Sequence, residues 1–401
     1  MRIEREYPRV VVSKKGERWL DSGHPWCYGS DVVEILDKYN NGDIVDVISP
    51  KGKYLGTGLL SLTSKIRVRI FSKDASTVID NSFWKRRIEY ALSYRQSVLC
   101  DLNACRLIFG ESDYFPGLTV DKYNDILVTQ IVTYGMEQLK PVIFPLLFEA
   151  LNENGFKIKG IYERNDVAIR KLEGLDEYCG WYGQQLKEQE TIINENNLKI
   201  VVNYVEGQKT GYFLDQRDNR RLVGEIAKNK RVLDCFCHTG SFALNCALNG
   251  ASKVTAVDVS EKALKQARTN AELNSLDDKI DFVCADVFDY LDRVNKKDYE
   301  FIILDPPAFT KSRKTIKSAY NGYLEINLKA IKLLGRGGYL ATCSCSHFMN
   351  HELFEKMLKE ASYKSGFDLK QISVSQQAKD HPILWNVPET DYLKFYIFQI
   401  I

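Results

Sequence analysis

Two cysteines and one aspartate are the side chains of this sequence best suited to covalent chemistry. Cys343 and Cys345 lie in residues 342–347 (TCSCSH), and Asp305 opens residues 305–309 (DPPAF). A thiolate that adds to C6 of a cytosine makes C5 electron-rich enough to accept a methyl group. An acid followed by two prolines lies in an extended turn with few donors, which suits the binding of a planar base. Strand alternation puts both cysteines on one face, so the pattern leaves the nucleophile open, and Cys345 is nearer the strand end.

A second stretch has the form of a nucleoside pocket. Residues 231–234 read as a buried strand ending at Asp234, a turn closes at Gly240, and residues 241–249 have helical spacing. The turn has neither the G-x-G-x-x-G nor the P-loop pattern, so it suits no pyrophosphate or triphosphate. Asp258 ends the next strand, where an acid can accept both hydroxyls of a ribose. A nucleoside site without a phosphate cradle indicates S-adenosylmethionine.

The residues expected around this cofactor all belong to strand ends or to the loop that precedes the first strand. Asp286 can bind an adenine amino group and also cap a helix, and Asp215 is expected to be a helix N-cap. Residue Phe213, with Gln216 or Arg217, is expected to cover the pocket. The full predicted set is Phe213, Gln216, Arg217, Asp234, Phe236, Cys237, Gly240, Asp258, Val259, Asp286, Val287, Asp305 and Pro306.

Strands and helices alternate through the C-terminal half, which predicts an α/β domain with a Rossmann-like, doubly wound sheet of seven strands. The last two strands suit an antiparallel hairpin at the sheet edge. The strand at 338–343 should neighbour the strand at 300–304, so that Cys345 and Asp305 face each other. The predicted strands are 231–234, 253–258, 280–284, 300–304, 338–343, 367–374 and 391–400, and the helices are 241–249, 261–274, 286–293, 320–334 and 350–364.

The N-terminal part predicts two further domains. Residues 1–73 combine short strands at 10–12, 44–48, 54–60 and 66–71 with a helix at 14–20, which indicates a small β-barrel. Residues 74–205 read as a central α+β domain and 206–401 as the Rossmann-like domain. The first domain has 13 Lys and Arg against 9 Asp and Glu. Lys14, Lys15 and Arg18 could contact RNA, but this charge alone favours a solvated basic face with Trp26 and Tyr28 in the core.

Composition excludes several classes of protein. No segment approaches 18 uninterrupted apolar residues, and residues 1–5 lack the apolar core of a signal peptide. Ten irregularly spaced cysteines in a long chain indicate a reduced cytoplasmic protein. The net charge of +2 means that nucleic-acid binding must depend on local patches. The Cys-x-Cys pairs at 235/237 and 343/345 do not match zinc-site spacing, so we expect no metal.

Over essentially its full length the chain resembles the bacterial large-subunit ribosomal RNA cytosine-5 methyltransferases. Five motifs carry the resemblance, in this order: residues 22–26 (SGHPW), 211–217 (GYFLDQR), 234–240 (DCFCHTG), 305–307 (DPP) and 344–346 (SCS). The resemblance implies an N-terminal PUA domain, a central domain and a class I methyltransferase domain. It also implies S-adenosylmethionine as donor, ribosomal RNA (23S) as substrate, and Cys345, not Cys343, as nucleophile. Many related enzymes have a second cysteine after the motif IV proline, where this chain has Pro307 and Ala308.

Other functions stay open at this point. Asp305 or a water could remove the C5 proton, and Phe309 and Tyr323 are expected to contact the RNA. An enzyme that methylates an exocyclic amine, such as N2 of guanine, would use the same DPP motif without a thiol. A ribosome assembly factor that binds S-adenosylmethionine without catalysis is a third possibility. The sequence also allows a homodimer.

Overall fold

The computed structural model describes residues 5–310 and 312–401, so the N-terminal residues 1–4 of the signal-peptide argument lie outside the described part. The chain divides into two compact units. The first unit consists of Met1–Thr191, Val202–Leu214 and Lys379–Thr390, and the second of Ile192–Val201, Asp215–Ala378 and Asp391–Ile401. The loop between the last two strands therefore belongs to the first unit, although both of those strands belong to the second. The predicted boundaries at residues 73/74 and 205/206 stay a prediction.

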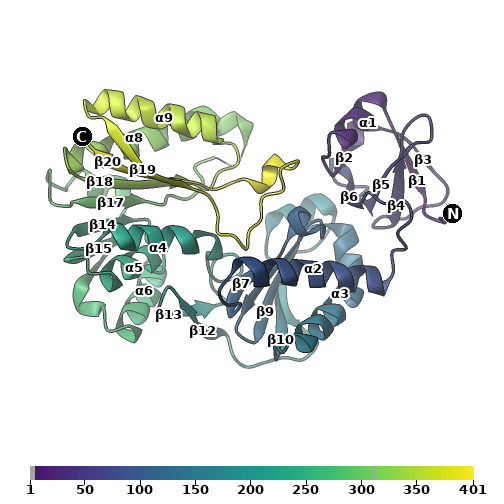
Figure 1. Cartoon of the computed structure of the whole chain (residues 1–401), viewed down its shortest axis with the longest axis horizontal. Coiled ribbons are helices and arrows are strands. Elements are labelled where there is room, and N and C mark those ends of the chain that lie inside the picture. Colours follow the sequence, from purple (N-terminus) through teal and green to yellow (C-terminus); the bar gives the residue numbers. More distant parts are fainter. Residues whose placement is uncertain (1–4, 311) are drawn as a thin grey trace. The chain divides into compact units, whose positions relative to one another are not determined.

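The first unit begins with a six-stranded sheet in the order β2-β6-β5-β4-β1-β3 (Figure 1). Its valines and leucines alternate toward a small core that includes Val10, Val45 and Leu60. Two of these strands, β2 and β3, are missing from the sequence prediction because they are short and their apolar alternation is weak. The elements are β1 (Arg9–Val12), α1 (Lys14–Asp21), β2 (Trp26–Tyr28), β3 (Val32–Leu36), β4 (Ile44–Ile48), β5 (Tyr54–Leu60) and β6 (Ile66–Ser72).

A five-stranded sheet, in the order β11-β10-β9-β8-β7, follows in the same unit. Helices α2 (Asn81–Val98) and α3 (Tyr134–Glu153) pack against each other and against its apolar face, through residues such as Trp84, Phe115 and Phe144. The strands are β7 (Ala104–Phe109), β8 (Leu118–Tyr123), β9 (Ile126–Ile131), β10 (Gly160–Arg164) and β11 (Cys179–Tyr182). A separate ribbon of β12 (Glu190–Glu195) and β13 (Leu198–Asn203) has residues in both units.

The second unit is a seven-stranded sheet in the order β16-β15-β14-β17-β18-β20-β19. Helices α4, α5 and α6 cover one face, and α8 and α9 cover the other (Figure 1). The strands are β14 (Arg231–Cys235), β15 (Lys253–Asp258), β16 (Ile280–Cys284), β17 (Phe301–Leu304), β18 (Tyr339–Ser344), β19 (Leu369–Ser375) and β20 (Lys394–Ile400). The helices are α4 (Arg217–Ile226), α5 (Ser241–Leu248), α6 (Glu261–Leu273), α7 (Val287–Leu291), α8 (Ile316–Leu334) and α9 (His351–Ser365).

The predicted Rossmann-like sheet is confirmed, including its antiparallel last pair. Strand β20 pairs antiparallel with both β18 and β19, and the other neighbouring pairs are parallel. The four residues of β17 are fully buried, as expected for a central parallel strand covered on both faces. Because the five parallel strands share one direction, their carboxyl ends lie along one edge of the sheet. Within the described part of the chain, no helix is long and apolar enough to cross a membrane.

Two local predictions are wrong. Helix α8 begins at Ile316, four residues before the expected start at 320. Asp215 is not an N-cap: α4 has Gln216 at that position, without a capping hydrogen bond from its side chain. Asp215 lies one residue earlier, in a 3-10 turn, where its Oδ2 accepts a hydrogen bond from the Tyr392 hydroxyl at 2.7 Å. A tertiary partner therefore replaces the local cap.

Candidate active site

The end of strand β14 presents a buried carboxylate with one unused oxygen. Asp234 is fully buried, and its Oδ2 accepts a hydrogen bond from the Ala243 N–H at 2.9 Å. Among the described residues, no donor reaches Oδ1. Burial, with the negative charges of Asp305 and Asp258, raises the pKa of this carboxyl well above its ordinary value, against the Ala243 hydrogen bond. A buried acid of this kind needs a donor or a cation from a ligand, since an unsatisfied buried oxygen is costly.

The turn after β14 is held in an unusual backbone conformation. Phe236 and His238 adopt left-handed φ angles of 62° and 50°, and Gly240 closes the turn at 79°. Such angles cost roughly 1 kcal/mol or more in a residue with a side chain, so other contacts must stabilise the turn. One is the hydrogen bond from the His238 N–H to Asp258 Oδ2, at 2.9 Å. This bond ties the first turn to the tip of β15.

Asp258 and Asp286 are placed at the next two strand ends. Asp258 also accepts the Ser260 N–H through Oδ1 at 2.9 Å, and each of its oxygens keeps a second lone pair for a ribose hydroxyl. Asp286 caps α7 through its Oδ1, which accepts the N–H groups of residues 288 and 289. The helix-cap role predicted for Asp286 is thus present. Val259 is 73% exposed, whereas the Val287 side chain is buried and leaves only its backbone for a ligand.

Asp305, at the end of β17, is the centre of a second polar cluster. Its Oδ1 accepts hydrogen bonds from the Cys343 thiol at 2.8 Å and from Gln216 Nε2 at 3.2 Å. Burial raises the pKa of Asp305 to about 6, helped by the charge of Asp215 and opposed by the Cys343 and Gln216 bonds and by Arg220. Its carboxyl therefore changes charge close to neutral pH, which is useful for a general base.

The two cysteines of β18 differ in their surroundings. Strand β18 runs parallel to β17 with Thr342 opposite Leu304, so Cys343 lies beside Asp305. Cys343 is fully buried, and burial together with Asp305 raises the pKa of its thiol well above the ordinary value. Cys345 follows the last residue of the strand and is half-buried. The cysteine that donates a hydrogen bond to Asp305 is Cys343, and the predicted approach of Cys345 to Asp305 stays a prediction.

The remaining predicted cofactor residues fall into two groups. In the second unit, Pro306, which follows Asp305, and Cys237, in the turn after β14, are buried. Arg217 forms an ion pair with Glu195, with 3.7 Å between Nε and Oε2. Phe213 belongs to the first unit, where Lys209 Nζ lies 4.9 Å from its ring centroid. Its contact with the cofactor stays a prediction.

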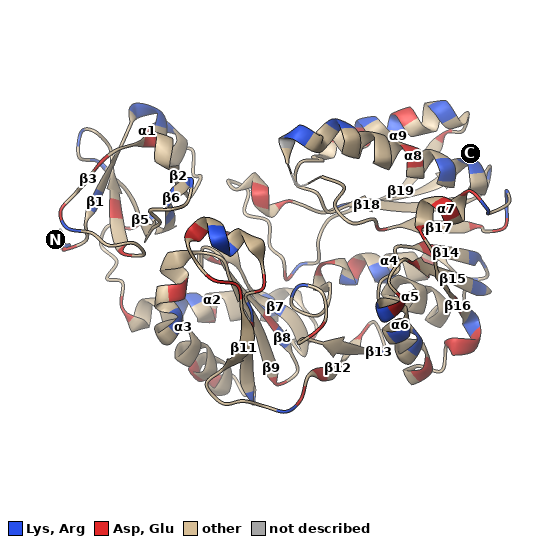
Figure 2. Ribbon diagram, turned by 180° about the vertical axis from the view of Figure 1, so that it is seen from behind, with Lys and Arg blue, Asp and Glu red and all other residues tan. Residues whose placement is uncertain are grey.

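The predicted RNA-contacting residues of the first unit lie on one helix. Lys14, Lys15 and Arg18 are exposed on α1, which carries these three basic residues and two acidic ones and is partly blue in Figure 2. Lys15 forms an ion pair with Asp31 at 3.2 Å, and its side chain is 75% exposed. The alternative, with Trp26 in the core, fits less well, because Trp26 is only half-buried and its Nε1 donates to Glu111.

The predicted RNA contact of Tyr323 does not fit its position. This side chain is fully buried in α8, and its hydroxyl accepts a hydrogen bond from Ser344 Oγ at 3.0 Å. Its ring packs against Phe309, with 4.6 Å between the centroids. Phe309 is half-buried and keeps exposed surface. Tyr323 therefore supports the end of β18 from inside, because the helix turns this position toward the sheet.

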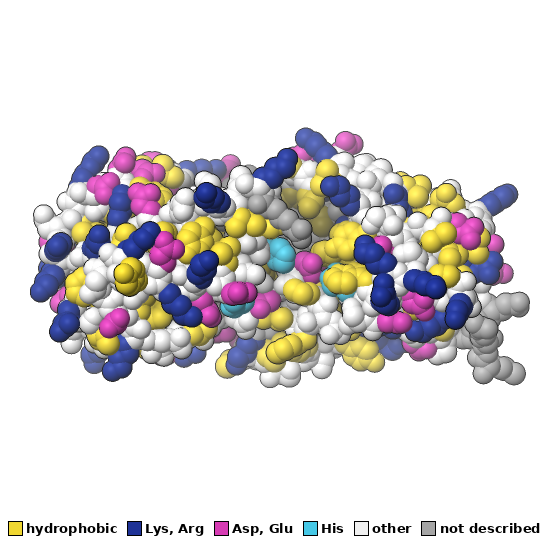
Figure 3. Space-filling model, turned by 90° about the horizontal axis from the view of Figure 1, so that it is seen from above, with side chains coloured by type: hydrophobic (Ala, Val, Ile, Leu, Met, Phe, Trp, Pro, Cys, Tyr) yellow, Lys and Arg dark blue, Asp and Glu magenta, His cyan; other side chains and the backbone are white. Residues whose placement is uncertain are grey.

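One face of the molecule shows how basic side chains of the described residues are distributed. On the face drawn in Figure 3, lysines and arginines are scattered among acidic and apolar side chains. This agrees with the small net charge of +2.

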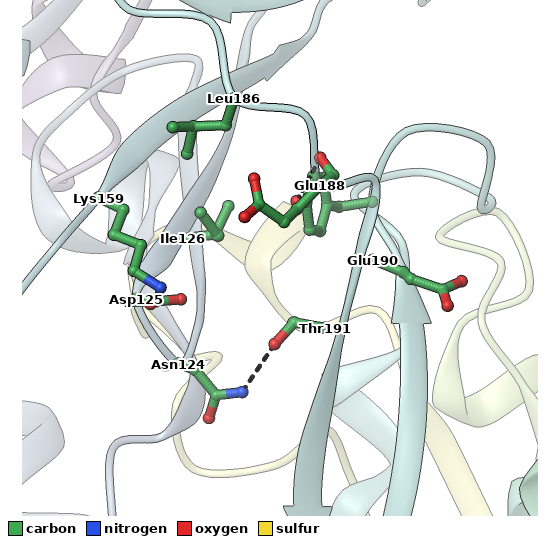
Figure 4. A pocket seen from close by; sticks show the side chains of 9 residues that line it. Asn124, Asp125, Ile126, Lys159, Leu186, Glu188, Glu190 and Thr191 are labelled. Atoms are coloured by element: carbon green, nitrogen blue, oxygen red, sulfur yellow. Dashed lines mark hydrogen bonds and ion pairs between the residues drawn. The ribbon is translucent and has the colours of Figure 1, made fainter.

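A separate cavity lies in the first unit and has a volume of about 270 Å³ (Figure 4). Its polar groups largely satisfy one another: Lys159 pairs with Asp125 at 2.6 Å, and Asn124 donates to Thr191 at 2.9 Å. None of the predicted site residues lines it. The lining residues are Asn124, Asp125, Ile126, Lys159, Leu186, Glu188, Glu190, Thr191 and Tyr204.

Sequence reasoning missed one charged residue close to the cysteines. Lys394 begins β20, is 1% exposed, and donates to the carbonyl of Ser346 at 2.7 Å. The available signal was a single lysine inside residues 393–398 (LKFYIF), which are otherwise apolar. Buried lysines are rare, so a cation at that position predicts a specific partner.

The sheet order, the unpaired oxygen of Asp234 and the carboxylate of Asp258 at the end of the next strand together fit a class I methyltransferase domain. These residues fit S-adenosylmethionine, because Asp234 and Asp258 offer carboxylates to a cationic ligand that carries a ribose. The model of the S-adenosylmethionine-dependent methyltransferase family matches residues 163–370, and the model of PUA-like domains matches residues 10–73. The protein is thus an S-adenosylmethionine-dependent methyltransferase with an N-terminal PUA-like domain.

Curated relatives identify the family more closely. The chain is 38% identical to Ribosomal RNA large subunit methyltransferase I of Klebsiella pneumoniae, over 98% of this chain and 99% of the relative. Identity to the protein of the same name from Pseudoalteromonas atlantica is 39%, with the same coverage. The chain belongs to this family.

Solved structures agree on the fold. A SAM-dependent methyltransferase from Streptococcus mutans is 22% identical, with a TM-score of 0.82, 98% of this chain and 99% of that chain being covered. A second structure with the same identity, TM-score and coverage is a methyltransferase complexed with SAH.

Proposed function

We propose that this protein methylates C5 of a cytosine in large-subunit (23S) ribosomal RNA, with Cys345 as the nucleophile. The observation that carries the proposal is the partial exposure of this cysteine. Cys235, Cys237 and Cys343 are buried at or just after the ends of β14 and β18, whereas Cys345, the first residue after β18, is only half-buried. The relatives named above act, by their names, on ribosomal RNA of the large subunit. Methylation of a pyrimidine at C5, as proposed for cytosine, is a reaction on that substrate that needs a thiol.

The proposed reaction needs two bonds to form before one proton leaves. The Cys345 thiolate adds to C6, and the electrons of the C5–C6 double bond make C5 nucleophilic. Asp234 and Asp258 would hold S-adenosylmethionine, which would supply the methyl group: as the C5–CH3 bond forms, the S–CH3 bond would break and S-adenosylhomocysteine would leave. A base then removes the proton from C5, the double bond re-forms, and the bond between C6 and Cys345 Sγ breaks. The thiol is returned unchanged, so one cysteine completes the cycle.

Asp305 is the candidate for the base that removes the C5 proton. It lies at the end of β17, next to β18, and its pKa is raised to about 6. Above that pH it is ionised and can accept a proton, and a raised pKa also makes it a better base than an ordinary aspartate. The chain has Ala308 where many related enzymes have a second cysteine, which leaves the carboxylate as the titratable group of the DPP motif.

Binding of RNA is proposed to use the exposed cations of α1. Changing Lys14, Lys15 and Arg18 together to Glu should weaken RNA binding about tenfold or more and reduce its salt dependence, because fewer counterions are released. Affinity for S-adenosylmethionine should stay the same. Filter binding at several salt concentrations measures the first effect and calorimetry the second. Unchanged RNA affinity would contradict the role of α1.

The reaction itself is tested by identifying the methylated nucleoside. The protein is incubated with labelled S-adenosylmethionine and unmodified large-subunit ribosomal RNA, and the RNA is digested to nucleosides. We expect 5-methylcytidine from the wild type and from Cys100→Ala, which removes an exposed thiol in the first unit. Cys345→Ala should give none. A methylated guanine, or an active Cys345→Ala variant, would favour methylation of an exocyclic amine, and RNA binding without any product would favour an assembly factor.

A further inference from the structure

One lysine is buried behind the end of β18. Lys394 lies opposite Ser344 in the antiparallel pairing of β18 and β20, and its neighbours Leu393 and Phe395 are fully buried. Its own side chain is 1% exposed. A lysine normally extends its ammonium to solvent, since burial of an unpaired charge costs several kcal/mol. A compensating interaction should therefore lie close to its Nζ.

Two backbone carbonyls accept hydrogen bonds from this ammonium. Lys394 Nζ donates to the Ser346 carbonyl at 2.7 Å and to the Tyr392 carbonyl at 2.8 Å. Within residues 5–310 and 312–401, no carboxylate forms an ion pair with it. The two carbonyls satisfy two of its three N–H groups but carry no full charge. The ammonium is thus anchored at the carbonyl of Ser346, the residue that follows Cys345 in the chain.

Three titratable groups face Lys394. They are Cys345 and Cys343, at the end of β18, and Asp391, in the segment that leads into β20. Burial lowers the pKa of Lys394 to about 8, and the negative charge of Cys345 is the largest influence in the opposite direction, ahead of Asp391 and Cys343. The amine is therefore still mostly protonated at pH 7. Tyr323, which faces Cys345 from α8, stays neutral because burial raises its pKa.

We propose that Lys394 is a positioning residue for the thiol chemistry: its buried ammonium stabilises the Cys345 thiolate and fixes residues 344–346 at the end of β18. The proposal rests on the proposed function, in which Cys345 is the nucleophile. The thiol releases its proton to solvent and the ammonium keeps its own, so the pair has no net charge. The attraction is reciprocal: the thiolate stabilises the protonated form of Lys394, and the ammonium stabilises the ionised form of Cys345 by the same free energy.

The wild-type protein provides the first test, without RNA. Iodoacetamide alkylates only the thiolate form of a cysteine, and mass spectrometry of the peptides gives a rate for each cysteine at each pH. We expect the half-maximal rate of Cys345 at a lower pH than that of the exposed Cys100. Partial burial alone would move it to a higher pH, so a Cys345 profile at or above that of Cys100 overturns the proposal.

Two substitutions separate charge from packing. Lys394→Met keeps the approximate length of the side chain and removes its charge. The pH profile of Cys345 alkylation should then move up by about one pH unit, so that alkylation at pH 7 becomes about tenfold slower. Lys394→Arg keeps a permanent cation, so its profile should stay within about threefold of the wild type at pH 7. Lys370→Met, at an exposed position of β19, is the matched control and should change nothing. Thermal melting and binding of S-adenosylmethionine show whether each variant is folded.

The outcomes distinguish this proposal from the proposed function. If Lys394→Met is folded and alkylates like the wild type, the inference is wrong, although 5-methylcytidine can still be formed. If the wild type makes no 5-methylcytidine while the alkylation profiles behave as expected, the function is wrong and the charge pair stands. When both hold, Lys394→Met should lower kcat about tenfold at pH 7 without changing the dissociation constant of S-adenosylmethionine.

Discussion

The two Cys-x-Cys pairs of the second unit have the same spacing and occupy the ends of two strands of one sheet, yet the surroundings of their second cysteines differ. Cys235 and Cys237 flank the first turn and are both buried, and burial raises the pKa of each thiol well above its ordinary value. In the second pair, Cys343 is buried against Asp305, and Cys345 is half-exposed next to a buried ammonium.

The difference shows that reactivity depends on where a strand ends and not on spacing. Strand β14 includes Cys235. In the turn that follows, the backbone N–H of Cys237 donates a hydrogen bond to the Val257 carbonyl. Strand β18 ends at Ser344, so Cys345 is the first residue after the strand. A buried thiol in apolar surroundings is inert, whereas an accessible thiol near a cation is reactive. We therefore propose that the first pair is structural and that Cys345 of the second pair takes part in the chemistry.

The largest predicted effect in this comparison comes from Asp305, the acid beside the second pair. Asp305→Asn should lower the rate of methylation by about 10²–10⁴-fold, the usual contribution of a general base. In the wild type, the rate should fall as the pH drops through about 6, where Asp305 becomes protonated. Single-turnover rates between pH 5 and 8 measure this limb. A variant with at least a tenth of the wild-type rate would show that another group removes the proton.

The same variant should be more stable than the wild type at neutral pH. The pKa of Asp305 is raised to about 6 in the folded state, so the ionised carboxylate lowers the stability of the fold above that pH. At lower pH the carboxyl is protonated, and this loss of stability disappears. Asp305→Asn should therefore raise Tm by a few degrees at pH 8 and by less at pH 5. Calorimetry at both pH values checks the sign. A lower Tm at pH 8 would mean that the hydrogen bonds of Asp305 outweigh its buried charge.

A smaller effect is expected at the buried member of the second pair. Cys343→Ala removes the S–H donor to Asp305, whose pKa should then rise further, since that hydrogen bond lowers it. Methylation at pH 7 should fall about tenfold or less, and the acid limb of the rate profile should move to higher pH. Loss of all activity in Cys343→Ala, with activity kept in Cys345→Ala, would exchange the roles of the two cysteines.

The smallest effect on activity is expected in the first pair. Cys235→Ser places a hydroxyl in the core beside Leu233 and Val257, where it should destabilise the fold by about 1–3 kcal/mol. Methylation per folded molecule should stay within about twofold. Urea denaturation gives the first quantity and a rate assay the second. A loss of activity without a loss of stability would mean that the first pair takes part in the chemistry.

Most of the sheet could be predicted from the sequence, because apolar runs that end in acids mark parallel strands. Asp234, Asp258 and Asp305 all lie where that pattern indicates. Strands β2 and β3 could not be predicted, because short strands without regular apolar alternation have no recognisable sequence pattern. The cap expected at Asp215 failed for a related reason: its partner, Tyr392, is 177 residues away in the chain.

The side-chain environment of the site was less accessible to sequence reasoning. The motif at residues 342–347 leaves Cys343 and Cys345 equivalent by alternation, and only the end of β18 at Ser344 separates them. Tyr323 is predicted to contact RNA, but the phase of α8 buries it. The burial of Lys394 near the cysteines could not be predicted either, because it depends on a strand pairing that joins positions 50 residues apart.

The covalent bond between Cys345 and the substrate is the central claim, and it can be trapped directly. RNA in which 5-fluorocytosine replaces cytosine has no C5 proton to lose, so the proposed adduct should persist after methyl transfer. With S-adenosylmethionine present, we expect an RNA–protein complex that survives denaturing electrophoresis, and its cross-linked peptide should contain Cys345. Cys345→Ala should form none, while Cys100→Ala should form as much as the wild type. A stable complex in Cys345→Ala, or a cross-link at Cys343, would contradict the account.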